Sequence, residues 1–209
     1  MNDKNKKFSL VIVDMQYDFC NPNGSLYVQG GYDLINKIAK FIKDNRNNIY
    51  EVIFTLDWHP YYHNSFEHCG GSWPVHCVKY SEGASIPNKL ISACLENDIH
   101  TQFIRKGYTD SDEYGAFGTC HTIDRNKPDD NRLYYTFNGE YQVRDNEIGT
   151  YSDNFYVCGL CGDYCVQETI KNLRKNPHFN VVAIEDLIKS IDNGESFNKY
   201  KEETNLKTI

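Results

Sequence analysis

Five short apolar runs recur along the chain, and each ends where the sequence turns polar or enters a glycine-containing turn. They span residues 8–13, 52–56, 101–105, 154–159 and 179–184. Apolar runs of this length that are rich in β-branched residues are typical of buried strands. Because helical patterns lie between them, we predict an α/β fold in which helices flank a largely parallel sheet.

The segments between these runs repeat apolar side chains at helical spacing. We predict one helix from an N-cap at Asp33 and another from an N-cap at Asp163, because aspartate is a favoured capping residue. Shorter helices are predicted around 87–95 and over roughly 193–203. Weaker patterns indicate a helix near 111–117, hairpin strands in LYYTF and YQV, and a short last strand in NLKTI.

The composition is that of a globular domain, with 40% hydrophobic and 24% charged residues. No repeat or linker divides the 209 residues, so we predict one domain over 1–209. The net charge of −7 argues against a nucleic-acid-binding surface. No apolar run approaches the ~20 residues that cross a bilayer or forms a signal peptide. We therefore expect a soluble cytoplasmic protein, whose eight cysteines are mostly buried thiols rather than disulfides.

Four chemically useful groups follow the predicted strands directly. Asp14, Asp57 and Lys106 each follow an apolar run, and the turn GLCGDYC with Cys165 follows the fourth run. In open parallel sheets, ligands bind beyond the carboxyl ends of the strands. We therefore expect two carboxylates, a lysine and a cysteine to converge on one edge of the sheet.

Cys165 is the candidate nucleophile, because the first turn of a helix favours a thiolate and offers N–H groups to a developing oxyanion. Asp14 could accept the thiol proton and return it to a leaving amine, while Lys106 could stabilise negative charge or orient Asp14. Each residue has an ordinary alternative. Cys165 would then be a small buried residue, Asp14 a turn cap and Lys106 a solvated lysine.

Several imidazoles follow Asp57 in the segment DWHPYYHNSFEHCGGSWPVHC. Side chains two apart in an extended segment point the same way, so Asp57 and His59 can reach one ion, with His76 as a natural third ligand. The further candidates are His63, Glu67 and His68. Nitrogen and carboxylate ligands suit zinc, iron or manganese with positions open for water or substrate. The alternative is a polar loop with scattered imidazoles.

These residues resemble those of the isochorismatase-like cysteine hydrolases, and most closely those of the nicotinamidases. The matching pieces are VIVDMQYDFCNPNGSL, DWHPYYHNSF, WPVHCVKYSEGA, the lysine of FIRKGY, and CGLCGDYCVQET. Their order and approximate spacing agree from about residue 8 to about residue 187. The resemblance implies a three-layer fold with a six-stranded parallel sheet between helices, and a catalytic triad of Cys165, Asp14 and Lys106.

The resemblance also implies one divalent metal ion, with zinc first and iron or manganese as alternatives. Its implied ligands are Asp57, His59 and His76, with His63 as a fourth ligand in some members. The implied role of the metal is to bind the pyridine nitrogen of nicotinamide, with waters filling the other positions. Two aromatic side chains match positions that sandwich the substrate ring, namely Phe19 and Trp73.

The implied oxyanion hole uses the backbone N–H groups of Cys165 and Cys161, and a cis peptide between Leu160 and Cys161 enters this turn. The chain departs from the family pattern in two places. Cys161 replaces a small residue, commonly alanine, so a second thiol lies beside the nucleophile. Residues 119–150 have no counterpart that we can align, and we interpret them as a lid, a hairpin or an oligomer contact.

The function that these residues favour is hydrolysis of nicotinamide to nicotinate and ammonia, in the context of pyridine-nucleotide salvage. The thiolate would attack the carboxamide carbon, Asp14 would protonate the departing ammonia, and water would hydrolyse the thioester. The alternatives are an amidase of this fold acting on a ureido or carbamoyl amide, and a non-catalytic scaffold. A true isochorismatase is disfavoured, because its vinyl-ether chemistry needs no cysteine. We expect a small-molecule substrate and allow for a homo-oligomer, with no nucleic-acid or membrane partner.

Overall fold

The computed structural model describes residues 7–108, 113–117, 119–122, 135–137, 140–142 and 147–209. At its centre lies a six-stranded sheet with the strand order β10-β9-β8-β1-β2-β3, in which all neighbours run parallel. The six strands are β1 (Phe8–Val13), β2 (Ile49–Asp57), β3 (His100–Lys106), β8 (Asn154–Gly159), β9 (Asn180–Ile188) and β10 (Lys207–Thr208).

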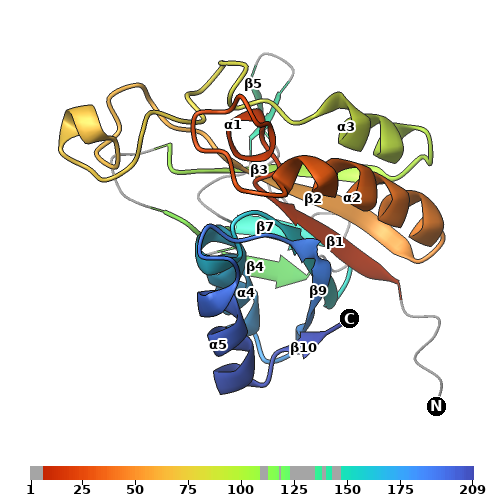
Figure 1. Ribbon diagram of the computed structural model, residues 1–209. Helices are drawn as coiled ribbons and strands as arrows, with labels where there is room; N and C mark the ends of the chain where they lie inside the picture. Colours follow the sequence, from red (N-terminus) through yellow and green to blue (C-terminus); the bar gives the residue numbers. More distant parts are fainter. Residues whose placement is uncertain (1–6, 109–112, 118, 123–134, 138–139, 143–146) are drawn as a thin grey trace.

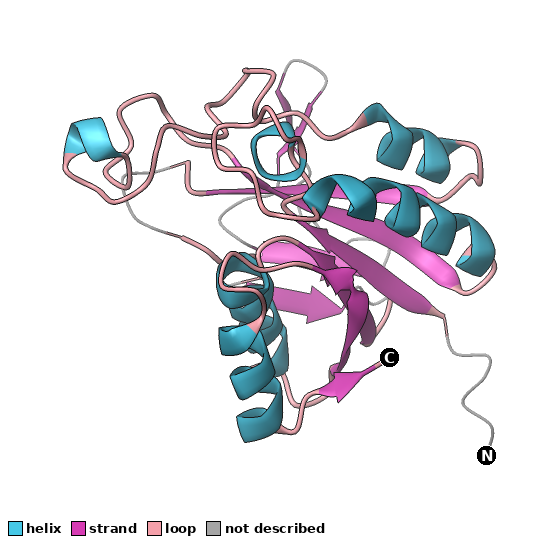
Figure 2. Ribbon diagram, in the orientation of Figure 1, coloured by secondary structure: helices cyan, strands magenta, loops and turns pink. Residues whose placement is uncertain are grey.

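Helices cover both faces of this sheet, which gives three layers (Figures 1 and 2). The α-helices are α1 (Tyr17–Cys20), α2 (Gly31–Asn45), α3 (Asn88–Leu95), α4 (Gln167–Arg174) and α5 (Glu195–Thr204). Two further helical turns are the 3-10 helix η2 (Glu67–Cys69) and the π-helical turn η3 (Gly162–Val166). Figure 1 shows α2 and α3 on one face, and α4 and α5 on the other.

Strand β1 shows why both faces need a cover. Successive side chains of a strand point to opposite faces. Leu10 and Ile12 pack into the cluster beneath α2 and α3, whereas Val11 and Val13 pack into the cluster beneath α4 and α5. A strand buried on both faces reads as a continuous apolar run, and this explains the FSLVIV pattern.

The five strands predicted from the apolar runs are confirmed, and the short last strand predicted in NLKTI corresponds to β10. Strand β9 continues to Ile188, beyond the predicted end at residue 184. Both predicted caps are wrong. Asp33 lies within the first turn of α2, whose N-cap is Gly30 in the left-handed region at φ 83°. Asp163 lies inside η3, and its Oδ2 accepts the backbone N–H groups of the β9–α5 connection instead.

The segment 119–150 contributes two small strand pairs within its described residues. Strands β5 (Tyr135–Phe137) and β6 (Glu140–Gln142) pair antiparallel, in agreement with the predicted hairpin. Strands β4 (Thr119–Thr122) and β7 (Glu147–Thr150) pair parallel. The predicted helix near 111–117 is absent over 113–117, and the rest of that segment lies outside the described residues. A role as lid or oligomer contact, like the single domain over 1–209, remains a prediction.

The cysteines whose side chains are described are all free thiols, and six of these seven are buried. This agrees with the expectation of buried thiols rather than disulfides for that part of the chain. Among the described residues, no helix combines the length and the apolar character needed to cross a membrane.

Candidate active site

The predicted strand-end residues meet at the carboxyl edge of the sheet. Asp14 follows β1, Asp57 ends β2 and Lys106 ends β3, while Cys165 lies in η3 just beyond β8. These four strands are neighbours in the order β8-β1-β2-β3, and Asp57 and Lys106 are paired in register. A cavity of about 440 Å³, counted with its open mouth, lies against this edge.

Lys106 is the centre of a buried polar cluster. Its Nζ lies 2.7 Å from Asp14 Oδ2 and 3.6 Å from Cys165 Sγ. It also donates a short hydrogen bond to Asp57 Oδ1. The side chain has no exposed surface, so this lysine is not the solvated residue of the ordinary alternative. The strand-end carboxylates and the cysteine therefore share one buried cation.

Burial and the charges of neighbouring groups shift the pKa values within this cluster in different directions. Burial lowers the pKa of Lys106, but Asp14 and Asp57 outweigh it and hold that pKa well above its ordinary value. Burial raises the pKa of Asp57, but Lys106 and the neighbouring imidazoles of His59 and His76 hold it well below its ordinary value. Lys106 and Asp57 are therefore both charged.

The other two members of the cluster hold protons more tightly. Burial raises the pKa of Asp14, and Asp57 adds to that effect against the opposing influence of Lys106. Burial also raises the pKa of Cys165 well above that of an ordinary thiol, although Lys106 opposes it. For Cys165, burial and the charges of Asp14 and Asp57 therefore outweigh the influence of Lys106 and of the helix N-terminus, which both favour a thiolate.

Local backbone geometry brings Asp14 and the nucleophile turn together. Asp14 has φ 45°, and its Oδ1 accepts a 2.6 Å hydrogen bond from Thr55 Oγ1. Gly159 ends β8 with φ 116°, and a Cβ there would lie 2.1 Å from Val13 O. Only glycine permits this close approach of the two strand ends. The turn that carries Cys165 thus starts directly beside the turn that carries Asp14.

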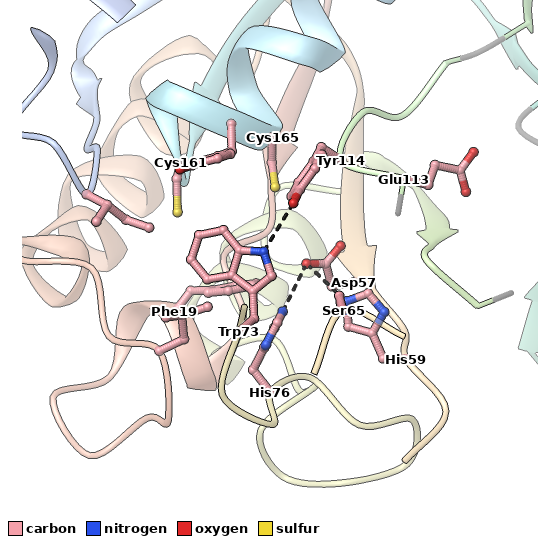
Figure 3. Close-up of a pocket in the computed structure, with 13 residues that line it drawn as sticks. Phe19, Asp57, His59, Ser65, Trp73, His76, Glu113, Tyr114, Cys161 and Cys165 are labelled. Carbon is pink, nitrogen blue, oxygen red and sulfur yellow. Dashed lines mark hydrogen bonds and ion pairs between the residues drawn. The ribbon is translucent and has the colours of Figure 1, made fainter. Parts of the chain in front are cut away.

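The peptide between Leu160 and Cys161 is cis, as the resemblance implied. In η3, the Val166 N–H donates to Cys161 O at 2.9 Å. The Cys161 N–H has no backbone acceptor among the described residues. Figure 3 shows the thiols of Cys161 and Cys165 on the same side of the cavity. Both residues implied for the oxyanion hole are therefore at the cavity wall.

Three of the predicted metal ligands converge. One ligand atom from each of Asp57, His59 and His76 lies within 4.8 Å of the other two. Asp57 Oδ2 is 3.6 Å from His59 Nε2 and 3.8 Å from His76 Nε2 (Figure 3). Ligand atoms about 2.1 Å from one tetrahedral ion lie about 3.4 Å apart. A small contraction would bring the three atoms to bonding distance of one ion.

The two imidazoles are oriented for this purpose by backbone carbonyls. His59 Nδ1 lies 2.7 Å from Gly107 O, and His76 Nδ1 lies 2.7 Å from Pro74 O. A carbonyl can only accept, so each Nδ1 carries a proton, and a neutral ring held in this way offers the lone pair of Nε2 to a metal ion. Such outer contacts are typical of metal-binding histidines. The donor set therefore fits a divalent metal ion.

The other candidate ligands are not in this group. The ring centroid of His63 is 4.3 Å from that of His59, and its Nδ1 lies 2.7 Å from Ser65 Oγ. Glu67 and His68 belong to η2 and are exposed. The His68 ring instead packs at a tilt against that of Tyr61, with centroids 5.2 Å apart.

Aromatic side chains form the walls of the cavity. Phe19 and Trp73 both line it, as the resemblance implied, and the Phe19 ring centroid is 5.3 Å from that of His76. Trp73 Nε1 donates a 3.1 Å hydrogen bond to Tyr114 Oη (Figure 3). Sequence reasoning missed several further wall residues, because no sequence pattern shows which side chains face a cavity. They are Leu26, Ser65, Glu113, Tyr114, Tyr164 and Ile191.

The sequence is similar to curated nicotinamidases. It is 28% identical to a nicotinamidase of Saccharomyces cerevisiae over 96% of this chain and 97% of the relative. It is 31% identical to a nicotinamidase of Escherichia coli over 78% of this chain and 74% of the relative. No protein-family model matches the chain.

The fold is also similar to the folds of several solved structures. PnC1 from L. infantum, in complex with nicotinate, superposes with a TM-score of 0.72 at 29% identity, covering 100% of this chain and 95% of that one. The yeast nicotinamidase bound to the inhibitor nicotinaldehyde gives 0.72 at 26% identity, covering 96% and 98%. The pyrazinamidase of Pyrococcus horikoshii in complex with zinc gives 0.66 at 27% identity, covering 97% and 98%. The chain therefore belongs to the nicotinamidases of the isochorismatase-like hydrolase family.

Proposed function

We propose that this protein hydrolyses nicotinamide to nicotinate and ammonia through a thioester on Cys165. One observation carries the proposal: Lys106 joins Cys165, Asp14 and Asp57 in one buried cluster at the wall of an aromatic cavity. Structures of similar proteins hold nicotinate or nicotinaldehyde. A thiol beside an acid–base group is the arrangement that acyl transfer needs.

In the proposed reaction, Asp14 takes the thiol proton as Cys165 Sγ attacks the carboxamide carbon. A ligand atom of Asp14 and Cys165 Sγ lie within 4.8 Å of one another, so a small movement brings them into contact. The N–H groups of Cys161 and Cys165 would stabilise the oxyanion. Asp14 then gives its proton to the amino group of the intermediate, which leaves as ammonia when the C–N bond breaks and the thioester forms. In the second half, Asp14 takes a proton from the attacking water and returns it to Cys165 Sγ as the C–S bond breaks and nicotinate leaves.

Lys106 supports this cycle by its charge. Asp14 alternates between carboxylate and carboxylic acid, while Asp57 remains a carboxylate beside it. Two carboxylates and a forming thiolate would repel one another strongly in a buried site. The buried ammonium of Lys106 reduces this repulsion at every step, because it contacts all three groups.

We propose that Asp57, His59 and His76 hold one divalent metal ion. Zinc is the first candidate, because the similar Pyrococcus horikoshii pyrazinamidase is in complex with zinc and because zinc accepts this donor set. When bound, the ion supplies a Lewis-acidic position for the ring nitrogen and for water. His63 is proposed only as an additional ligand, since its ring centroid is 4.3 Å from that of His59 but His63 lies outside the converging group.

Phe19 and Trp73 are proposed to sandwich the pyridine ring. Both line the cavity, together with the three metal ligands on one side and the two cysteines on the other (Figure 3). A ring between them would place one end towards the imidazoles and the other towards Cys165. This arrangement favours an aromatic carboxamide over a flexible ureido compound as substrate.

The test is ammonia release from nicotinamide, pyrazinamide and a ureido compound, measured in parallel on the same purified protein. We expect turnover of nicotinamide and no turnover of the ureido compound. Hydrolysis of the ureido compound alone would favour the alternative amidase, and absence of any turnover by metal-loaded protein would favour the scaffold. The proposed cytoplasmic location and homo-oligomer are tested by cell fractionation and sedimentation.

A further inference from the structure

The side chain of Gln16 takes the place of a missing strand neighbour beside Asp57. Strands β1 and β2 pair in parallel as far as Val13 and Thr55. The chain then turns away at Asp14, which has φ 45°. On this side, Asp57 therefore lies beyond the last backbone partner that β1 offers. On its other side, Asp57 is still paired with Lys106 of β3.

Gln16 fills this gap with three hydrogen bonds from one amide. Its Nε2 donates to Asp57 O at 2.8 Å and to Ala84 O at 3.1 Å, and its Oε1 accepts the Asp57 N–H at 2.8 Å. The side chain is completely buried. The orientation of the amide is fixed, because only oxygen can accept the N–H and only nitrogen can donate to the two carbonyls.

The backbone that Gln16 holds carries a carboxylate with two separate contacts. Asp57 Oδ1 accepts from Lys106, while Oδ2 faces His59 Nε2 at 3.6 Å and His76 Nε2 at 3.8 Å. A small rotation of the Asp57 backbone would disturb both contacts together. Fixing that backbone on both sides therefore fixes the direction in which Oδ2 points.

We propose that Gln16 is a positioning residue, which orients Asp57 for metal binding without touching metal or substrate itself. This inference rests on the proposed metal site at Asp57, His59 and His76. Losing an outer partner of a metal ligand commonly weakens metal affinity or activity by about 10- to 100-fold. We expect a loss in this range when Gln16 can no longer bond the Asp57 backbone.

The experiment is a Co²⁺ titration of metal-free protein, followed by the visible absorption of bound cobalt. The Gln16→Met variant keeps the length and volume of the side chain and removes its hydrogen bonds. The matched control is Gln102→Met. Gln102 is also buried and also donates through Nε2, but its acceptor is Glu51 near the other end of β2. Melting temperatures show how much stability each variant loses.

We expect Gln16→Met to weaken Co²⁺ binding about 10- to 100-fold and to change the cobalt spectrum. Gln102→Met should lose stability but bind Co²⁺ within about twofold of the parent. If Gln16→Met fails to fold, Gln16→Asn replaces it, because that amide is one methylene too short to reach the Asp57 backbone. Equal affinity and spectrum in the parent and a folded Gln16 variant would overturn the inference. A parent that binds no Co²⁺ would instead overturn the proposed metal site.

Discussion

Strand β2 carries a buried carboxylate near each end, and the two are stabilised in opposite ways. Asp57, at the carboxyl end, contacts the buried ammonium of Lys106, and its pKa is held well below the ordinary value against the effect of burial. Glu51, near the amino end, is also buried, but it accepts hydrogen bonds from the neutral donors Ser9 Oγ, Gln102 Nε2 and the Tyr151 N–H. Burial raises its pKa, and those bonds only partly oppose the rise.

The two carboxylates of β2 therefore have different roles: Asp57 belongs to the candidate active site, whereas Glu51 stabilises the fold. Two carboxylates that remain charged or exchange protons beside a cation and a thiol form a reactive site. A carboxylate that joins neutral groups from several segments acts as a structural connector. Glu51 accepts hydrogen bonds from Ser9 Oγ of β1 at 2.6 Å and from the Tyr151 N–H at 3.0 Å. Substitutions at the two ends should therefore change different measured quantities.

The largest effect is expected when Cys165, beside the carboxyl end of β2, is replaced by alanine. Since the nucleophile works as a unit with its base, we expect kcat to fall by about 10⁶, with substrate binding retained because the ring pocket remains. The measurements are ammonia release and nicotinamide binding by calorimetry. Cys161→Ala is the matched control, because it removes the neighbouring thiol and keeps both backbone N–H groups. Activity of Cys165→Ala within tenfold of the parent would contradict the covalent mechanism.

Replacing Lys106 with methionine removes the cation that distinguishes the two ends of β2. Burial raises the pKa of Asp14 and Lys106 opposes this, so the pKa of Asp14 should rise further in the variant. Asp14 would then become a base only at higher pH. We expect kcat to fall by about 10²- to 10⁴-fold, with the remaining activity shifted to higher pH.

The measurement is kcat/KM against pH for the parent and Lys106→Met, with folding checked by circular dichroism. Leaving two buried carboxylates without their cation should also cost stability, on the order of 3 to 5 kcal/mol. A folded variant whose pH profile overlays that of the parent in height and position would show that the lysine has no part in catalysis.

Removing the metal tests whether activity depends on the proposed metal site at the carboxyl end of β2. Treatment with a chelator should lower activity at least tenfold, and one of zinc, iron or manganese should restore it. His76→Ala should reproduce the loss, because His76 Nε2 faces Asp57 Oδ2. His68→Ala is the matched control from the same loop, since His68 is exposed. Full activity in protein shown to be metal-free would remove the metal from the proposal.

The part of this site that could be predicted from the sequence is the part that follows strand ends. Asp14, Asp57 and Lys106 each follow an apolar run, and parallel pairing brings such positions to one edge. Gln16 could not be identified in this way. Its role depends on a side chain reaching a backbone 41 residues away, and no periodic pattern records such a contact.

The predicted caps failed for a related reason. An aspartate at a helix start is also free to bond backbone groups of another segment, and propensity does not distinguish the two uses. Asp163 bonds the N–H groups of Ile191 and Asp192 at 3.0 Å, and so joins the nucleophile turn to the β9–α5 connection. Tyr114 and Tyr164 were missed because neither an irregular segment nor a helical pattern shows which side chains face a cavity.

The smallest expected effect tests the amino end of β2. Because the pKa of Glu51 is raised in the folded protein, the folded state binds this proton more tightly than the unfolded chain does. The resulting stabilisation is fully present below the ordinary glutamate pKa, and it is lost as the pH rises through the raised value. Glu51→Gln is neutral at every pH, so its stability relative to the parent should improve as the pH rises through this window.

The measurement is the melting temperature of the parent and Glu51→Gln across the acidic to neutral range. A difference of 1 kcal/mol shifts the melting temperature of a protein of this size by about 2 to 4 °C. We expect the two curves to converge or cross with rising pH, while kcat for nicotinamide stays within about twofold, because Glu51 lies at the opposite end of β2 from Asp57. If the melting temperatures of the two proteins changed in parallel with pH, burial would not raise the pKa of Glu51. A large loss of kcat in Glu51→Gln without loss of stability would contradict the purely structural role of Glu51.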